Sequence, residues 1–383
     1  MINSLLVCSD TYPTPTDPAF SFVGQLCEEF SRQGVKVTVL APLSYTSHLV
    51  RGYPLHPRKR VYNIEGGQPI TVLQPYTLTF GMKFKRLNDI ILKWVMGRAI
   101  RKYGRSADAF YAHFWHNGYR LYPFAKKHKK PLFVATGEET ILLGRSEPIT
   151  EKKEFAEYVK GVICVSSKNQ NESLELGLTS CDKCEVYPNS IDNKLFRKLN
   201  KEELRKKYGY SNDDFIVAFV GWFIDRKGPQ RVAAAISRLA ELPIKSFFIG
   251  KASHTENIIP DCPGILYKGE VMHDNLPDFL NMADVFVLPT LSEGCCNAII
   301  EAMACGLPII SSNLPFNWDV LNSCNSIMVD PQNVDEIALA LKTLFEDRNK
   351  CQKMSIAALE SAKELTLEKR AKKILGFISS RMS

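Results

Sequence analysis

The chain contains 383 residues, of which 45% are hydrophobic and 23% are charged, and its formal net charge at pH 7 is +8. This length exceeds one ordinary hydrophobic core and predicts two domains, and the composition is that of a soluble globular protein. No apolar stretch is long enough to span a bilayer, and the N-terminal segment has no basic region before Asp10, which argues against a signal peptide. We therefore expect a cytoplasmic protein.

Short apolar runs alternate with helical stretches in the first half of the chain. Residues 5–8 and 36–40 are expected to be strands on either side of a helix over residues 22–32, which Gly34 ends. Further strands are expected at residues 109–113, 132–135 and 162–165. This alternation predicts a parallel sheet with helices on both faces.

A second series of strands follows the polar stretch PNSIDNKLFRKLNKEEL, so we place a domain boundary near residue 195. Its expected strands are residues 215–220, 245–249, 265–267, 285–288, 309–311 and 327–329. The last segment, residues 333–383, has a helical pattern and no proline. The chain therefore predicts two α/β, Rossmann-like domains in sequence.

Rossmann-like halves are also typical of oxidoreductases, but no G-x-G-x-x-G follows the first strand of either half. Gly24 stands alone behind a Pro- and Thr-rich loop. It either lets a ligand approach the backbone closely or relieves helix packing. The eleven cysteines are scattered, which favours reduced thiols, and the single C-x-x-C of Cys181 and Cys184 lacks the second ligand pair of a zinc site.

The segment SEGCCNAIIEAMACGLPII carries two glutamates, Glu293 and Glu301, separated by seven residues. A helix is expected to begin at Cys295 or Cys296 and to end at Gly306, with Glu301 inside it. Eight residues of partly helical chain span roughly 12 Å, and the helix N-terminus between the glutamates offers unpaired N–H groups to an anion. The implied ligand is a nucleoside diphosphate sugar, whose diphosphate rests at the helix start while each carboxylate accepts hydrogen bonds from a sugar.

The longer segment LPTLSEGCCNAIIEAMACGLPII resembles the donor-site signature of glycosyltransferase family 4, which comprises retaining enzymes of the GT-B fold. Other segments of the family occur here in the same order: SFVGQLCEEFSRQGVKVTVLAP, YAHFWHNG, PNSIDNKLF and VGWFIDRKGPQRV. The first of these is most similar to bacterial surface-polysaccharide enzymes of the teichuronic-acid type. The resemblance implies an acceptor-binding domain over residues 1–195, a donor-binding domain over residues 196–365, and a C-terminal helix, about 366–383, that crosses back to the first domain.

Several residue roles follow from the resemblance. Glu301 would accept hydrogen bonds from the ribose, and Glu293 from the transferred sugar. His113, at the end of a strand, would contact the donor sugar near the reacting carbon, although without the resemblance a core histidine satisfied by backbone groups is the simpler interpretation. The other expected donor-binding residues are Gly24, Gly221, Ser292, Gly294, Cys295, Cys296 and Asn297.

Arg226 and Lys227 follow a strand of the second domain, where ligands bind in open α/β sheets, and two cations there could neutralise a diphosphate leaving group. A solvated surface pair is the alternative. The chain contains no D-x-D pair that would hold a divalent metal against a diphosphate, so we expect no metal and no other cofactor. Trp222 stands where the family commonly has Arg, and Thr136 stands where relatives usually have His.

Four further side chains of the first domain are weaker candidates. His116 and Asn117 lie in the same loop as His113, and Glu138 and Glu139 either bind an acceptor hydroxyl or are ordinary loop charges. Residues 83–105 contain eight Lys or Arg and one acid, Asp89, with apolar residues at helical spacing. This stretch is either a half-buried surface helix or a contact with an anionic membrane, and no nucleic-acid recognition module accompanies it.

The resulting prediction is a retaining glycosyltransferase that moves a sugar from a nucleoside diphosphate sugar to a glycan or lipid-linked acceptor hydroxyl in bacterial surface polysaccharide synthesis. A GT-B enzyme that acts on the nucleotide sugar itself, as an epimerase or hydrolase, is one alternative. A catalytically silent nucleotide-sugar binding protein is another. The expected location is the cytoplasm, at the inner face of the cell membrane if the basic stretch contacts it.

Overall fold

The structure is a computed structural model that describes residues 2–14, 20–52, 55–80, 82–143, 149–253 and 255–382. The chain forms two compact units. Unit 1 comprises Met1–Val165, Asn169–Tyr187 and Leu367–Ser383, and unit 2 comprises Ser166–Lys168 and Pro188–Thr366. The sequence analysis placed the boundary near residue 195. The units divide earlier because residues 188–200 are held within unit 2, where Asn281 accepts a hydrogen bond from the backbone of Leu199 at 2.7 Å.

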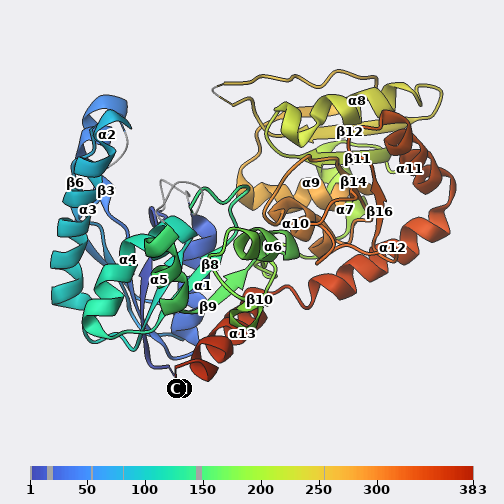
Figure 1. Cartoon of the computed structure of the whole chain (residues 1–383). Helices are drawn as coiled ribbons and strands as arrows, with labels where there is room; N and C mark the ends of the chain where they lie inside the picture. The colour runs from blue at the N-terminus through green and yellow to red at the C-terminus, as the bar shows by residue number, and fades with distance from the viewer. Residues whose placement is uncertain are drawn as a thin grey trace. The chain divides into compact units, whose positions relative to one another are not determined.

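Unit 1 contains an eight-stranded sheet in the order β10-β9-β8-β7-β1-β2-β5-β4, in which β4 alone is antiparallel to its neighbour. Figure 1 labels the strands β10, β9 and β8 of this sheet. The strands are β1 (Ser4–Cys8), β2 (Lys36–Leu40), β4 (Lys59–Tyr62), β5 (Ile70–Leu73), β7 (Ala109–His113), β8 (Leu132–Thr136), β9 (Val159–Cys164) and β10 (Cys184–Val186). The sequence analysis predicted the central strands, whose apolar runs are buried on both faces, as in parallel sheets generally.

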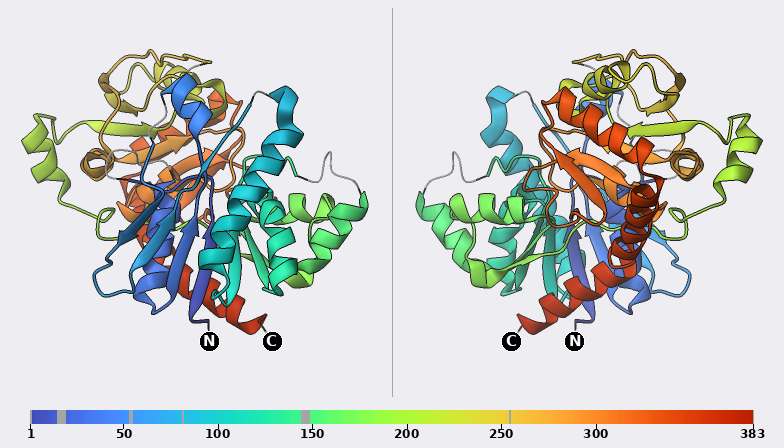
Figure 2. Two further views of the ribbon diagram at one scale, coloured as in Figure 1. Left: turned by 90° about the vertical axis from the view of Figure 1, so that its left-hand side faces the viewer. Right: turned by 90° about the vertical axis from the view of Figure 1, so that its right-hand side faces the viewer.

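Helices cover both faces of this sheet, as predicted. They are α1 (Ser21–Arg32), α4 (Trp115–His128), α5 (Ile149–Tyr158), α6 (Ser167–Glu175) and α13 (Leu367–Ser380). One core cluster contains Phe30 of α1 and Ile374 of α13, and the other contains Trp115 of α4 and Phe155 of α5. The C-terminal helix α13 therefore belongs to the core of unit 1, where it packs against α1 and β9 (Figure 2).

An outlying group of elements in unit 1 precedes β7. It consists of β3 (Leu43–Ser44), α2 (Tyr45–Arg51), β6 (Tyr76–Thr77) and α3 (Lys85–Ala99), followed by a π-helical turn, Ile100–Gly104. Strands β3 and β6 pair only with each other, in a parallel two-stranded sheet. Within the described residues, no helix is both long enough and apolar enough to cross a membrane.

Unit 2 contains a six-stranded parallel sheet in the order β13-β12-β11-β14-β15-β16. Its strands are β11 (Phe215–Val220), β12 (Ile244–Ile249), β13 (Ile265–Gly269), β14 (Val285–Leu288), β15 (Ile309–Ser312) and β16 (Ser326–Val329). Its helices are α7 (Lys201–Tyr208), α8 (Pro229–Ser237), α9 (Leu276–Met282), α10 (Asn297–Ala304), α11 (Val334–Glu346) and α12 (Arg348–Ala362). Both parallel sheets of the predicted α/β class are therefore present.

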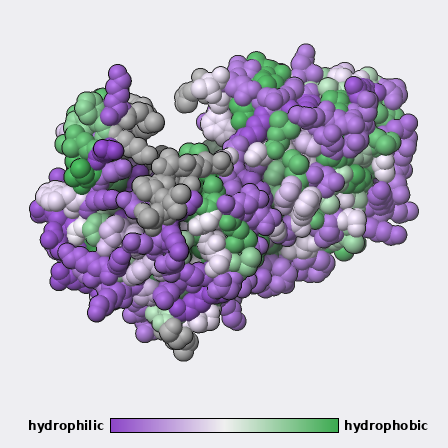
Figure 3. Space-filling model, viewed as in Figure 1, coloured by the Kyte–Doolittle hydropathy of each residue, from purple (hydrophilic) through white to green (hydrophobic). Residues whose placement is uncertain are grey.

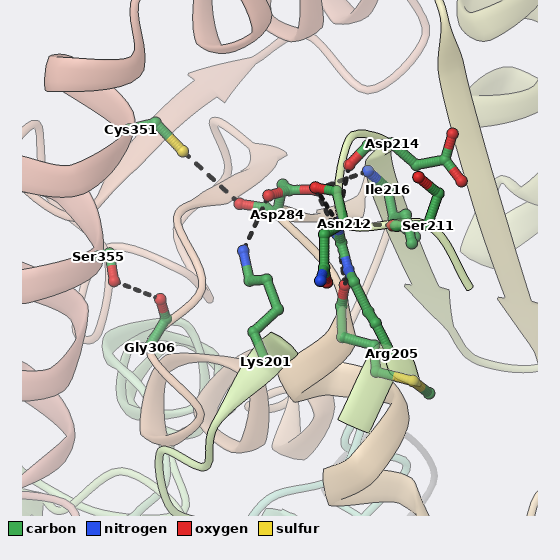
Figure 4. A network of polar contacts seen from close by, with 11 residues as sticks. Lys201, Arg205, Ser211, Asn212, Asp214, Ile216, Asp284, Gly306, Cys351 and Ser355 are labelled. Atoms are coloured by element: carbon green, nitrogen blue, oxygen red, sulfur yellow. Dashed lines mark hydrogen bonds and ion pairs between the residues drawn. The ribbon is translucent and has the colours of Figure 1, made fainter. Parts of the chain in front are cut away.

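A buried ion pair fastens α7 to this sheet (Figure 4). The Arg205 side chain, which is 1% exposed, lies 2.8 Å from Asp284 and donates to the carbonyl of Met282. Asp284 also accepts from the backbone N–H of Ile216 at 2.7 Å and from Lys201 at 2.8 Å. These hydrogen bonds satisfy a charge that would otherwise be costly to bury, and they connect α7 to the starts of β11 and β14.

The strand order reverses once in each sheet, between β1 and β7 in unit 1 and between β11 and β14 in unit 2. In open α/β sheets, ligands bind outside the carboxyl ends of the strands at such a switch point. His113 ends β7, and Gly221 follows β11 directly. The topology therefore identifies one candidate ligand-binding edge in each unit.

Candidate active site

At the switch point of unit 2, the chain leaves β11 through Gly221 and passes through a 3-10 turn, Asp225–Lys227, before α8 begins at Pro229. A Cβ on Gly221 would meet only ordinary contacts at 3.5 Å, so sterics alone do not require glycine there. Gly250 is the constrained position, because a Cβ on it would lie 1.8 Å from the carbonyl oxygen of Gly221. The sequence analysis did not identify Gly250.

Glu293 lies between the two predicted cations of this turn. Its Oε1 is 2.9 Å from Nη1 of Arg226 and 2.5 Å from Nζ of Lys227, and it accepts from the Thr290 hydroxyl at 3.0 Å. Arg226 also donates to the carbonyl of Ser292 at 2.6 Å. The structure therefore brings together Arg226, Lys227 and Glu293, and Thr290 is a further member that the sequence analysis missed.

Lys227 remains a cation in this cluster. Burial by itself lowers the pKa of its ammonium group, but the interactions with Cys296 and Glu293, which include the hydrogen bond to Glu293, outweigh it, so the net pKa is raised. The Lys227 and Glu293 side chains are only 12% and 14% exposed. A buried cation held beside a helix start suits the binding of a phosphate group.

Helix α10 begins at Asn297 with Cys296 as its N-cap residue, in agreement with the predicted start. Asn189 stabilises this start by donating to the carbonyl of Cys295 at 3.2 Å and to the Asn297 side chain at 2.9 Å. Burial raises the pKa of the Cys296 thiol to about 11, so this cysteine is protonated at neutral pH and is unsuited to nucleophilic attack. Ser292 directly precedes Glu293 in the loop after β14, and Gly294 directly follows it, ahead of α10.

Glu301 lies within α10, and its side chain is 14% exposed. Its Oε1 lies 3.5 Å from Nε2 of His273, which comes from a 3-10 turn, His273–Asn275, ahead of α9. The hydrogen bond with Glu301 is the largest cause of a raised pKa of His273. The carboxylate thus has a neighbour that spacing along the sequence did not suggest.

At the switch point of unit 1, His113 is almost completely buried, and its ring packs between Phe22 and Phe114 at centroid distances of 5.2 and 5.1 Å. Burial, followed by the charge of Arg370, lowers the pKa of His113 to about 3, so the imidazole is neutral. Within the described residues, its Nδ1 has no hydrogen-bond partner. Buried polar atoms without a partner are uncommon, so this nitrogen is a candidate for contact with a ligand or a water molecule.

Asp10, directly after β1, forms a polar group with residues of α4. Its Oδ1 lies 2.7 Å from Nε2 of His116, 3.3 Å from Nδ2 of Asn117 and 3.6 Å from Nη1 of Arg120. Burial alone would raise the pKa of Asp10, but these neighbours outweigh it and lower the pKa. The sequence analysis considered His116 and Asn117 but missed Asp10 and Arg120.

Glu138 has a structural role that answers one open question. Its Oε1 accepts from the backbone N–H of Trp115 at 2.8 Å, and its Oε2 accepts from Thr136 at 2.6 Å and from Gly137 at 2.9 Å. Glu138 therefore supplies a hydrogen-bond acceptor at the start of α4, where N–H groups lack intrahelical partners. Thr136, at the position that is usually His, supports Glu138.

Two other positions have clear surroundings. A Cβ on Gly24 would lie 2.5 Å from Cγ of Pro13, so this glycine permits close packing between α1 and the loop before it. Trp222 is 44% exposed, and the Lys251 ammonium stands 5.7 Å from its ring centroid. In the described part of the chain, no three His, Cys, Asp or Glu side chains are grouped to hold a metal ion.

Two family models match the chain, one described as Glycosyltransferase Family 4 over residues 20–195 and one as Glycosyl transferases group 1 over residues 200–361. A Bacillus subtilis (strain 168) protein named for teichuronic acid biosynthesis, the glycosyltransferase TuaC, is 25% identical over 357 residues, which is 88% of each chain. The UDP-Gal:alpha-D-GlcNAc-diphosphoundecaprenol alpha-1,3-galactosyltransferase of Escherichia coli is 27% identical over 213 residues, 49% of this chain and 51% of that protein.

Solved structures agree on the fold. A sucrose-phosphate synthase from Thermosynechococcus elongatus superposes with a TM-score of 0.76 at 17% identity, covering 99% of this chain and 98% of that one. HepE from Anabaena, in complex with UDP and glucose, gives a TM-score of 0.70 at 17% identity, covering 99% and 100%. The two parallel-sheet units are thus those of the GT-B fold, and the family matches follow one another along most of the chain. The chain is a member of glycosyltransferase family 4 and an enzyme of sugar transfer.

Proposed function

We propose that this glycosyltransferase takes its sugar from a nucleoside diphosphate sugar and transfers it, with retention of anomeric configuration, to a glycan or lipid-linked hydroxyl in bacterial surface polysaccharide synthesis. The observation that carries the proposal is the cluster of Arg226, Lys227 and Glu293 at the switch point of unit 2, ahead of the N-terminus of α10. The names of two relatives support it: TuaC is named for a surface polysaccharide, and the Escherichia coli relative for a UDP-sugar donor and a lipid-linked acceptor.

In this proposal unit 2 binds the donor. The diphosphate contacts Arg226, Lys227 and the first N–H groups of α10, where it competes with the Glu293 carboxylate for the two cations. Glu293 then accepts hydrogen bonds from the transferred sugar, and Glu301 from the ribose. Negative charge grows on the diphosphate as the glycosidic bond breaks, so two fixed cations stabilise the transition state more than the ground state. HepE, which has this fold, was solved with UDP and with UDP-glucose.

The reaction forms a bond between the acceptor oxygen and the anomeric carbon on the face from which the phosphate oxygen leaves. The acceptor proton passes to that leaving oxygen. Retention and this same-face course rest on family membership. Because the cations and the helix N-terminus carry the positive charge in this proposal, no metal and no other cofactor takes part.

Unit 1 is proposed to bind the acceptor. Asp10 is ionised and 36% exposed, so its free lone pairs can accept a hydrogen bond from a sugar hydroxyl. The neutral His113, whose Nδ1 is unpaired in the described structure, is proposed to contact the donor sugar near the reacting carbon. The protein is proposed to act in the cytoplasm, with the basic stretch of residues 83–105 against the inner face of the membrane.

Incubation of the purified chain with labelled nucleoside diphosphate sugars tests the proposal. Transfer of label to an acceptor hydroxyl, with the donor's anomeric configuration in the product by NMR, is the expected result. Conversion of the donor without any acceptor would instead identify an epimerase or hydrolase, and binding without turnover a silent binding protein. A product with inverted configuration would contradict retention alone.

A further inference from the structure

Unit 1 also contains a pocket of about 540 Å³ beside helix α3, on elements that the proposed transfer does not use. Its walls come from the start of β4, the segment after β5, the second half of α3 and the π-helical turn that follows. Four cationic side chains line it: Arg58, Lys59, Arg98 and Lys102. The described residues that line the pocket include no Asp or Glu, and a positive lining without acids favours an anionic ligand.

The four cations stand over aromatic rings. The distances to the ring centroids are 4.8 Å from Arg58 to Tyr76, 5.4 Å from Lys59 to Tyr103, 5.0 Å from Arg98 to Trp94 and 5.2 Å from Lys102 to Tyr103. Among the described residues, none of the four forms an ion pair with a carboxylate. The rings hold the cations in place but leave their N–H groups available to an anion.

Exposed apolar side chains lie on the same group of elements. They are Leu49 and Val50 of α2, Phe80 and Phe84 ahead of α3, and Leu87, Ile90 and Trp94 of α3. Val50 is 81% exposed and Ile90 65%. Figure 3 shows apolar side chains gathered at the upper left, where α2 and its neighbouring strands lie in Figure 1. Apolar residues beside unpaired cations are the combination that binds at a membrane interface.

We propose that this pocket binds the phosphate group of an anionic phospholipid while the exposed apolar side chains enter the bilayer surface. The inference deepens the membrane contact in the proposed function and rests on it, but it does not depend on sugar transfer. A lipid fits better than a small phosphate in solution, because a soluble anion would use the cations and leave the apolar side chains in water. The pocket thus provides a defined headgroup site on unit 1.

The test measures binding of the whole chain to vesicles of equimolar phosphatidylglycerol and phosphatidylcholine, by flotation. The pocket variant replaces Arg98 and Lys102 with Gln, and the control replaces Lys350 and Lys353 of α12, two other exposed cations, with Gln. Each cation near anionic lipid strengthens binding about fivefold, so the pocket variant should bind about 25-fold more weakly. The control should bind nearly as the wild type does.

Three outcomes would contradict the proposed headgroup site. The pocket variant could bind as tightly as the control, which would leave a general basic surface without a headgroup site. The wild type could bind phosphatidylcholine vesicles equally well or bind neither kind, which would also remove the membrane contact from the proposed function. Soluble glycerol 3-phosphate could displace the protein from the vesicles when its concentration equals that of the lipid phosphate, which would indicate a site for small anions.

A second variant, Leu87→Ser with Ile90→Ser, separates the lipid from the soluble phosphate. This variant should bind vesicles more weakly than the wild type does. Its affinity for soluble glycerol 3-phosphate, which is expected to be low, should be the same as that of the wild type. Transfer to a soluble acceptor should be unaffected in both variants, so a loss of transfer alone would concern the proposed function and not the pocket. Thermal unfolding of each variant checks that the exposed substitutions leave the fold intact.

Discussion

The two switch points are built alike and differ in how far they are closed to solvent. In unit 2 a carboxylate, Glu293, meets two cations, and the three side chains are 14%, 12% and 29% exposed. In unit 1 another carboxylate, Asp10, meets His116 and Arg120, and these three side chains are 36%, 40% and 34% exposed. The same topology therefore presents one enclosed, permanently charged group and one open group containing an imidazole.

This difference matches the two proposed ligands. Charges at low exposure interact more strongly than charges in water, so the enclosed cations of unit 2 suit a diphosphate whose charge grows during the reaction. The charges of the open group of unit 1 are more exposed to water and act over shorter range, so this group suits hydrogen bonds with a neutral hydroxyl.

The largest effect is expected from Lys227→Ala. Removing one positive donor from a developing anion lowers kcat by roughly 100- to 1000-fold in comparable sites. Single-turnover transfer with saturating donor measures this step. The matched control is Lys342→Ala, which removes an exposed cation of α11 in the same unit. If the Lys227 variant keeps more than half of the wild-type rate, the enclosed group of unit 2 is not the leaving-group site.

Glu301→Gln is expected to act on donor binding, because a ribose contact is equally present in ground and transition states. Losing the charge from such a hydrogen bond should raise the donor Kd roughly 10-fold or more with little change in kcat. Isothermal titration with the nucleoside diphosphate measures the change. Since Glu301 also contacts His273, the His273→Ala variant is the control, and it should retain most donor affinity. A normal donor KM with the whole loss in kcat would contradict the assigned role.

Asp10→Asn is expected to raise the acceptor KM by about 10-fold while the donor KM stays the same, since an amide accepts hydrogen bonds less strongly than a carboxylate. Initial rates at varied acceptor and saturating donor give the value. Asn also keeps the shape of the side chain, so the polar group with α4 should persist. An equal rise in both KM values would show that Asp10 only supports the fold, and the division between the units would fail.

The sequence predicted those elements and site residues whose pattern lies within one local segment of the chain. The apolar runs predicted strands such as β7 and β11, and the helical run between Cys296 and Gly306 predicted the start of α10 close to where it lies. The short or polar strands β4 and β10 were missed, because they carry few apolar residues in sequence and form the two edges of the sheet.

Contacts between segments far apart in the chain could not be predicted from the sequence. Asp10 meets His116 from 106 positions away, and Glu293 meets Arg226 from 67 positions away, distances at which local pattern carries no information. Glu138 illustrates the same limit, because its capping of α4 depends on how β8 and α4 lie together. Polar residues directly after the strands at a switch point were the available signal, and Asp10 could have been found from it.

The smallest expected effect is that of removing divalent metal. We expect transfer to proceed at the same rate in excess EDTA, because Arg226, Lys227 and the N-terminus of α10 already place positive charge where the diphosphate would bind. A second positive centre would add little to an anion that two cations already neutralise. Rates are compared before chelation, after it, and after magnesium or manganese is returned. Full inhibition that either metal reverses would show that these cations do not suffice, and the enclosed group of unit 2 would then bind its ligand through a metal ion.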